Sequence, residues 1–433
     1  MQIKMNYGRK GIDLDLSDEW TSLVIEKSGM PIPANPEQAI AEALTTPVKA
    51  RSLAEEAKGC QTVCILICDI TRPVPNGLIL PPVVDALTAA GIKPDNITIL
   101  VATGLHRPNE GEELRELIGS DQVLAQVKVE NHFAENDDDH IYISTTERGT
   151  PVKLDRRFVQ ADLKIVTGLV EPHFMAGYSG GRKVIAPGIA HRDTITTFHN
   201  ASFLEHPSSA NCVLDGNPLH EELTEIVGML GRILAVNTVI DDKRNLSFVN
   251  YGEISESHAW AIEYMRRYAE IDLERRFQTV ITSGGGYPLD KTYYQTIKGL
   301  VGAMDIVRPG GNIIIFSECS EGLGTAAFIK AQQRMVELGT EGFLESIRTK
   351  QQADIDEWQT EMQLKPMKVA NIHLFSDALL ENDRQWTGAN CQKSGQNPDS
   401  FIRSIIESSR DKDIAIIPEG PYVIPRFQGK PST

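Results

Sequence analysis

The sequence has few of the features that would place a protein in a membrane, outside the cell or on a nucleic acid. No apolar run approaches the roughly 18 residues of a transmembrane helix. The N-terminus, MQIKMNYGRKGIDLDL, lacks the apolar segment of a signal peptide. Positive charge is in deficit, because 43 Lys and Arg against 59 Asp and Glu give a formal net charge of −16. This balance argues against DNA, RNA and acidic membranes as partners. We therefore expect a cytoplasmic protein that acts on a small molecule.

Cysteine is also scarce, with six residues in 433, and no pair has the C-x₂-C spacing of a zinc site. Cys60, Cys64 and Cys68 recur every four residues and so suggest a metal site. However, the surrounding TVCILICDI alternates like a strand, on which Cys64 and Cys68 would be buried neighbours. Free cysteine is among the most buried residue types, so we interpret these thiols as core residues.

The length and the apolar pattern predict an α/β protein of two domains. A chain of 433 residues is too long for one ordinary core. Seven short apolar runs predict strands, at residues 63–67, 97–101, 163–166, 279–282, 312–317, 369–375 and 414–417. We expect a larger α/β domain over residues 1–265 and a smaller α/β domain over residues 266–433, with a cleft between them over which the smaller domain closes.

Polar loops follow three predicted strands of the larger domain. Asp69 and Arg72 follow the first strand, His106 follows the second, and His173 and Lys183 follow the third. In open α/β sheets, ligands bind beyond the carboxyl ends of the strands. We therefore expect these five side chains to converge on one crevice. Arg72, in a loop bounded by proline, is suited to bidentate binding of a carboxylate.

The segment GYSGGRK, from Gly177 to Lys183, predicts a site for a phosphorylated ligand. Glycine permits positive φ and close approach of a backbone to a ligand, and N–H groups near the start of a helix favour anions. The segment is not a P-loop, because Arg182 separates the glycine from the lysine and Val184 stands in place of a hydroxyl residue. GGGYPLD in the smaller domain likewise lacks the G-x-G-x-x-G spacing of a dinucleotide site.

Three histidines, and two residues on one predicted helix, are further candidate site residues. His106, His173 and His199 lie at the ends of predicted strands or in adjoining loops. Imidazole can serve as acid, base or metal ligand near neutral pH. Together the three rings could also form the ligand set of a zinc hydrolase, which is an alternative. Gln295 and Lys298 are three residues apart and share a helix face, which either contacts a ligand or is only solvated.

Five motifs spread over nearly the whole chain are DITRPVPN, ATGLHRP, EPHFMAGYSGGRK, FHN and GGYPLDKTYYQTIKG. With these motifs the chain resembles the nickel-pincer lactate racemase family. The resemblance implies a pyridinium-3-thioamide-5-thiocarboxylic acid mononucleotide, joined to Lys183 through a thioamide. It implies Ni(II) held by two sulfurs and a ring carbon of this cofactor and by His199, a donor set that suits nickel. Further cofactor-binding residues are expected at Thr71, Arg72, Gly177, Ser179, Gly180 and Gly181.

The resemblance also implies racemisation or epimerisation of a 2-hydroxy acid by reversible hydride transfer. Direct removal of the Cα proton is difficult, because the adjacent carboxylate disfavours a carbanion. Oxidation to a 2-oxo acid and return of the hydride to the other face avoid that step. Inversion then needs one base for each enantiomer, and the matching residues are His106 and His173. The other implied site residues bind the substrate or support the binding groups: Arg72, Lys298, Gln295 and Asp69.

The sequence leaves the substrate and two other functions open. Members of the family act on lactate, malate, larger aliphatic or aromatic hydroxy acids, or sugar acids. Trp358 and Trp386 either shape the pocket or only pack, while Arg107 and Arg182 are candidates for a second carboxylate. The alternatives are a metal-dependent hydrolase that uses the three histidines and a non-catalytic nucleotide-binding homologue. Maturation would require cofactor-biosynthesis enzymes as partners, and a homo-oligomer is left open.

Overall fold

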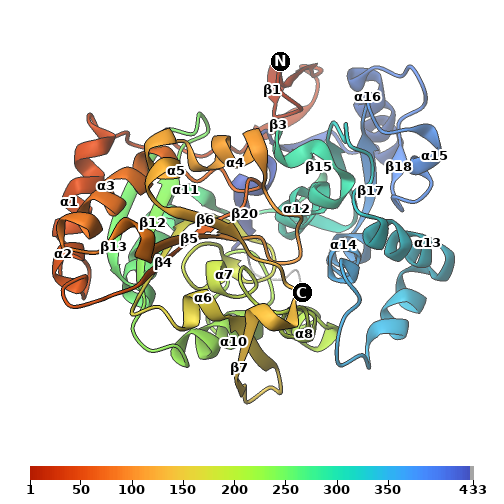
Figure 1. Ribbon diagram of the computed structural model, residues 1–433. Helices are drawn as coiled ribbons and strands as arrows, with labels where there is room; N and C mark the ends of the chain where they lie inside the picture. The colour runs from red at the N-terminus through yellow and green to blue at the C-terminus, as the bar shows by residue number, and fades with distance from the viewer. Residues whose placement is uncertain (430–433) are drawn as a thin grey trace. The chain divides into compact units, whose positions relative to one another are not determined.

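The computed structural model describes residues 1–429 and divides into two compact α/β units (Figure 1). The first unit contains residues 29–198 and 213–267. The second unit contains residues 1–28, residues 199–212 and the chain from Tyr268 on. Among the residues described, none of the helices combines the length and the apolar character that crossing a lipid bilayer requires.

The first unit is built on a six-stranded sheet in the order β13-β12-β9-β4-β5-β6, in which only the β12–β13 pair is antiparallel. Its strands are β4 (Val63–Cys68), β5 (Ile97–Ala102), β6 (Lys128–Asn131), β9 (Leu163–Leu169), β12 (Leu234–Ile240) and β13 (Leu246–Glu253). The predicted strands at 63–67, 97–101 and 163–166 are therefore present and form the centre of this sheet. Continuous apolar runs are typical of parallel strands that are covered on both faces.

Helices cover both faces of the first sheet. Side chains of β4 and β5 that point to one face pack with α1 (Pro36–Thr45) and α3 (Asn76–Ala89) in one apolar core. The short helix α7 (Arg182–Ile185) also packs on β4 and β9. The unit also contains α2 (Leu53–Glu56), α4 (Gly111–Ile118), α5 (Asp121–Gln126), α6 (Arg156–Val159), α8 (Arg192–Phe198), α10 (Pro218–Gly228) and α11 (Ile254–Ala269). Two hairpins complete it, β7 (His140–Thr145) with β8 (Pro151–Asp155), and β10 (Pro172–His173) with β11 (Gly177–Tyr178).

The second unit contains a fully parallel sheet in the order β18-β17-β16-β15-β19-β3. Its strands are β3 (Thr21–Val24), β15 (Phe277–Ser283), β16 (Val307–Phe316), β17 (Ala370–Phe375), β18 (Asn390–Cys391) and β19 (Asp413–Ile417). A hairpin of β1 (Gln2–Met5) and β2 (Ile12–Asp15) packs with α16 (Pro398–Ser409) in one apolar core of this sheet. Other elements are α9 (Ala201–Leu204), α12 (Tyr293–Ala303), α13 (Ala326–Ile347), α14 (Glu357–Val369), α15 (Glu381–Arg384), β14 (Glu270–Leu273) and β20 (Ile424–Phe427).

The units differ from the expected domains in two segments. Residues 1–28 belong to the second unit because β3 extends its sheet beside β19, with Thr21 opposite Asp413. Residues 199–212 belong there because α9 packs on α14. The expected domain boundary near residue 266 lies close to the point where the chain passes from the first unit to the second, between Arg267 and Tyr268.

Candidate active site

The loops beyond β4 and β5 bring two predicted residues into direct contact. Nδ1 of His106 lies 2.6 Å from Oδ2 of Asp69. The other oxygen of Asp69, Oδ1, accepts hydrogen bonds from the hydroxyl of Thr71 at 2.6 Å and from its backbone N–H at 3.2 Å. Burial alone would raise the pKa of Asp69, but His106, Thr71 and Arg72 together hold it below its usual value. The ionised carboxylate therefore fixes a proton on Nδ1 of His106, and Nε2 is the nitrogen that can accept one.

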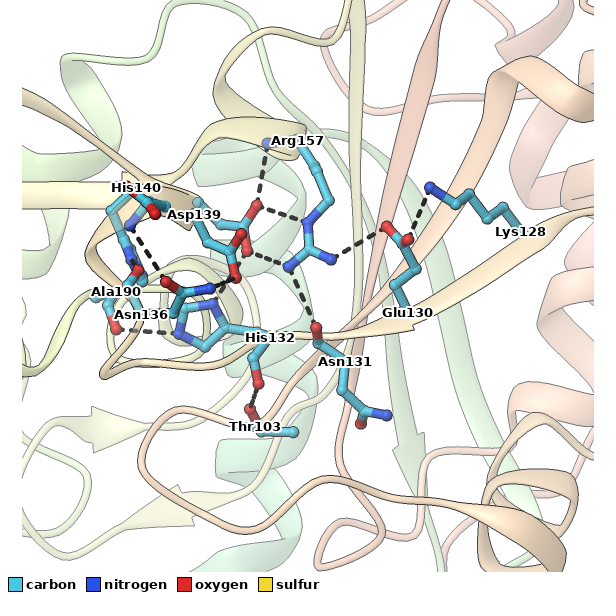
Figure 2. Close-up of polar contacts among 12 residues, drawn as sticks. Thr103, Lys128, Glu130, Asn131, His132, Asn136, Asp139, His140, Arg157 and Ala190 are labelled. Atoms are coloured by element: carbon cyan, nitrogen blue, oxygen red, sulfur yellow. Dashed lines mark hydrogen bonds and ion pairs between the residues drawn. The ribbon is translucent and has the colours of Figure 1, made fainter.

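A buried histidine supports the loop that carries His106 (Figure 2). The carbonyl of His132 accepts a hydrogen bond of 2.7 Å from the hydroxyl of Thr103, which lies three residues before His106. Its ring places Nδ1 3.2 Å from Oδ2 of Asp155 and Nε2 3.1 Å from the carbonyl of Ala190. Both ring nitrogens of His132 contact oxygen atoms within the fold. His132 is therefore held by contacts within the fold.

His173 lies in β10, in a tight hairpin whose backbone fixes the ring. The backbone N–H groups of Met175 and Ala176 both point to Nδ1 of His173, at 3.3 and 3.2 Å. Nδ1 is thus an acceptor, and the neutral ring carries its proton on Nε2. The tautomer is opposite to that of His106, where Nδ1 is the donor. The neutral rings therefore differ at Nε2, which carries a lone pair in His106 and an N–H in His173.

The loop before Lys183 needs glycine for reasons that lie within the protein. Gly177, Gly180 and Gly181 all have positive φ, of 78°, 78° and 48°. A Cβ atom at Gly177 would come within 2.4 Å of the carbonyl oxygen of Val213, and one at Gly181 within 2.7 Å of the ring of His258. Backbone conformation and close packing therefore account for these glycines, whereas the sequence alone suggested space for a ligand.

Lys183 lies in the short helix α7, and the backbone N–H of Lys183 donates a hydrogen bond of 3.0 Å to the carbonyl of Gly180. Burial, with the positive charges of Arg182 and Arg72, lowers the pKa of Lys183 to about 7. At neutral pH a substantial fraction of this amine is therefore uncharged and nucleophilic. Nη1 of Arg72 lies 3.6 Å from Oε1 of Glu171, and the sequence pattern did not indicate this ion pair.

The remaining predicted residues belong to the second unit. His199 is buried and stacks on Trp358, with ring centroids 4.9 Å apart and an angle of 37° between the planes. Trp358 in turn donates from Nε1 to the hydroxyl of Tyr294 at 3.3 Å, on the helix α12 that also carries Gln295 and Lys298. Oε1 of Gln295 is buried and has no hydrogen-bond partner among the residues described. An unsatisfied buried acceptor of this kind suits a ligand donor.

Several other sequence expectations can be compared with the structure. Arg107 makes two hydrogen bonds of 2.7 Å with the carboxylate of Glu113, and Arg182 is buried, so neither presents an obvious second carboxylate site. Within residues 1–429, no group of three or more His, Cys, Asp or Glu side chains could hold a metal ion. Cys64 is buried on β4, as expected for a core thiol, whereas Cys60 and Cys68 are only half-buried and pack at the margin of the core.

Comparison with known proteins identifies the family. Residues 7–211 match the lactate racemase N-terminal domain, and residues 274–424 match the lactate racemase C-terminal domain. A lactate racemase of Thermoanaerobacterium thermosaccharolyticum is 32% identical over 330 residues, which cover 76% of this chain and 77% of that protein. A lactate racemase of Lactiplantibacillus plantarum is 29% identical over 332 residues, or 75% of this chain and 77% of that protein.

Solved structures agree with the sequence relatives. The lactate racemase apoprotein of T. thermosaccharolyticum superposes with a TM-score of 0.90 at 28% identity, covering 98% of this chain and 100% of that chain. A Thermotoga maritima protein has the same fold, with a TM-score of 0.70 at 18% identity over 93% of this chain and 100% of that chain. The chain therefore belongs to the lactate racemase family of isomerases.

Proposed function

We propose that this racemase inverts the Cα centre of a 2-hydroxy acid and uses a nickel-pincer nucleotide tethered to Lys183. The observation that carries the proposal is the Asp69–His106 contact of 2.6 Å in the unit that also presents the low-pKa amine of Lys183. A fixed imidazole base and a nucleophilic amine are the two groups that the chemistry needs from this unit.

The residues fit the proposed cofactor. The positive charges of Arg182 and Arg72 act on Lys183 and favour an anionic group, such as a nucleotide phosphate, near the proposed tether. The cofactor would supply two sulfurs and a carbon to the nickel, together with the carbon that accepts hydride. The protein then needs to supply one imidazole, which we assign to His199. The lack of a three-residue ligand cluster within residues 1–429 is compatible with that requirement.

The other roles are proposed on the family resemblance, and the contacts of each side chain support them. His106 accepts the hydroxyl proton at Nε2, because Asp69 holds the proton on Nδ1. His173 is assigned to the opposite enantiomer on the family resemblance; because Nδ1 accepts from the backbone, Nε2–H is the group that it can present to a substrate oxygen. Arg72 binds the substrate carboxylate with its guanidinium.

Further contacts to cofactor and substrate are proposed on the family resemblance. Cofactor contacts are assigned to Thr71, Arg72, Gly177, Ser179, Gly180 and Gly181, and substrate contacts on α12 to Gln295 and Lys298. Lactate is the first substrate to test, because both curated relatives are lactate racemases.

Intact-mass measurement after co-expression with cofactor-building enzymes tests the tether. We expect a covalent adduct on Lys183, nickel in the metal analysis, and neither in the K183A variant. An unmodified chain that contains zinc would instead support the hydrolase. An adduct without exchange of the Cα hydrogen in a chiral screen of 2-hydroxy acids would support a non-catalytic nucleotide-binding protein.

Variants of the two histidines test the acid–base roles. H106Q and H173Q should lose turnover while they keep the adduct on Lys183. The exposed His206 provides a matched control, since H206Q changes the same side chain at a position outside the proposed site. Retention of full turnover in H106Q would overturn the assignment of the base.

A further inference from the structure

The turn of the hairpin that carries His173 is tight and strained. The carbonyl of Ala176 accepts a hydrogen bond of 3.0 Å from the backbone N–H of Tyr178, and the residue between them, Gly177, has a φ of 78°. A γ-turn with a positive φ at its centre is rare and strained. The N–H groups of Met175 and Ala176 in the same turn donate to Nδ1 of His173. The state of the ring therefore depends on a turn that is strained in isolation.

Two buried side chains hold the carbonyl groups of this turn from outside the hairpin. Nη2 of Arg182 donates a hydrogen bond of 3.0 Å to the carbonyl of Ala176. Nδ2 of Asn217 donates one of 2.9 Å to the carbonyl of Met175. Arg182 is 5% exposed and Asn217 is fully buried. Each of the two residues whose N–H group donates to His173 is thus held at its own carbonyl group.

The buried ring of His258 orients Arg182. Nη1 of Arg182 lies 3.2 Å from Nδ1 of His258, and Nε2 of the same ring lies 2.7 Å from the carbonyl of Ser179. A guanidinium only donates, so Nδ1 accepts and the ring proton is on Nε2. A Cβ atom at Gly181 would lie 2.7 Å from this ring, which is therefore packed against the backbone just before Arg182. The imidazole and the carbonyl of Ala176 together fix the direction of the guanidinium.

The start of helix α10 orients Asn217. Asn217 is the N-cap residue, and its Oδ1 accepts hydrogen bonds from the backbone N–H groups of Leu219 and His220, at 3.0 and 3.3 Å. Its Nδ2 also donates to the carbonyl of Val213 at 2.9 Å. An N-cap oxygen satisfies N–H groups that the helix itself leaves without partners. The amide of Asn217 therefore caps the helix with one end and holds the turn of His173 with the other.

We propose that Arg182 and Asn217 are positioning residues for His173. They hold the turn so that the N–H groups of Met175 and Ala176 stay directed at Nδ1, which keeps the proton of the neutral ring on Nε2. The proposal rests on the proposed function, because that function makes His173 a group that acts on the substrate. A strained backbone persists only where the surrounding structure fixes it, and two anchors from different elements supply that constraint here.

Nuclear magnetic resonance of the full-length apoprotein, labelled with ¹⁵N-histidine, reports the tautomer of His173 without any cofactor. H173Q identifies the signals of this ring. We expect the wild type to show a single tautomer, with widely separated resonances for a bare Nδ1 and a protonated Nε2. R182M removes one anchor, and N217S removes the other while it keeps an oxygen that can cap the helix. In both variants the two resonances should move closer together, because the tautomer with the proton on Nδ1 becomes populated.

Steady-state kinetics of the loaded enzyme with lactate give a second readout. Misplacement of a reacting group costs rate more than binding, so kcat of R182M and N217S should fall roughly 10- to 100-fold. KM should stay within about twofold of the wild type, because neither side chain is assigned a contact with the substrate. A change confined to KM, with kcat unaltered, would contradict the proposal.

Two matched substitutions are controls. R384M removes a largely buried arginine that donates to the carbonyls of Gln392 and Ser376 in the second unit. N35S changes an asparagine whose Oδ1 caps α1 through the N–H of Gln38. Both controls lose hydrogen bonds of the same kinds, and both should leave the resonances of His173 unchanged.

The proposal is overturned if R182M and N217S fold, as judged by circular dichroism, and keep the wild-type separation of the His173 resonances. A wild-type ring with its proton on Nδ1 would overturn it as well, and this measurement decides if neither variant folds. Because the spectra need no cofactor, failure of the proposed tether would be seen separately by intact mass.

Discussion

Replacement of Asp155 by asparagine tests its buried contacts with His132 and Arg157, two residues that Figure 2 shows. Asp155 is fully buried and accepts hydrogen bonds from the backbone N–H and Nε of Arg157, at 3.0 and 2.9 Å. It also contacts His132 at 3.2 Å. Burial would raise the pKa of Asp155, but these contacts more than offset it and lower the pKa to about 2. D155N keeps the shape of the side chain and removes its charge.

The expected loss follows from that shift. An aspartate whose pKa falls from 3.8 in the unfolded chain to about 2 in the folded chain contributes about 2.5 kcal/mol to the free energy of unfolding at pH 7. The contribution is complete above about pH 5, because there both states are ionised, and it is lost as the pH falls and the unfolded state takes up the proton. By pH 3 it should be about half as large. The difference in free energy of unfolding between the wild type and D155N should therefore become smaller as the pH falls.

Hydrogen exchange of peptides from β6 and β8 measures this deficit within the first unit, whether or not the second unit unfolds separately. D162N is a suitable control, since Asp162 is an exposed carboxylate that bonds the backbone N–H groups of Gln61 and Thr62. Its effect should be smaller than that of D155N. The reasoning would fail if D155N matched the wild type at pH 7, or if its deficit stayed constant from pH 7 to pH 3.

Three further substitutions test the proposed site. D69N removes the charged acceptor of His106 and should lower kcat roughly 10- to 100-fold with little change in KM, measured on loaded enzyme with lactate. G181A places a Cβ atom 2.7 Å from the ring of His258 at a φ of 48°, and should lower both the melting temperature and the yield of adduct in intact mass. R72K keeps charge but loses the planar fork, so steady-state kinetics should show KM rising more than kcat falls.

The sheet centres were predictable because buried parallel strands leave a strong signal. Four of the five residues from Val63 to Ile67 are aliphatic, and the other is the buried Cys64. The apolar run that begins at Ile97 is almost as continuous. The polar loops that follow them were therefore placed correctly after their strands. The pairing of β3 was not predictable, since four residues near the N-terminus hydrogen-bond to a strand almost 400 residues away. Nothing in the local pattern of β3 specifies that partner.

The site shows the same division between local and long-range information. The histidine and lysine candidates stand out by residue type, and the contact of Asp69 with His106 follows from two adjacent parallel strands. The tautomer of each histidine depends on which group faces its Nδ1. For His106 this group is the carboxylate of Asp69, which is brought there by a tertiary contact, and for His173 it is the backbone of a tight hairpin. The contact between Arg182 and His258 spans 76 residues, which no spacing could reveal.

The cost of burying Arg182 yields a last prediction that separates stability from function. Burial lowers the pKa of Arg182 to about 9, which shows how unfavourable the charged form is at this position. Apolar side chains of similar volume often replace buried ions with no loss of stability or with a gain. R182M should therefore leave the melting temperature unchanged or raise it, and any loss of adduct on Lys183 would then be a loss of function rather than of stability. If R182M instead melted well below the wild type, the hydrogen bonds of Arg182 to Ala176 and His258 would be its main contribution, and the residue would be structural.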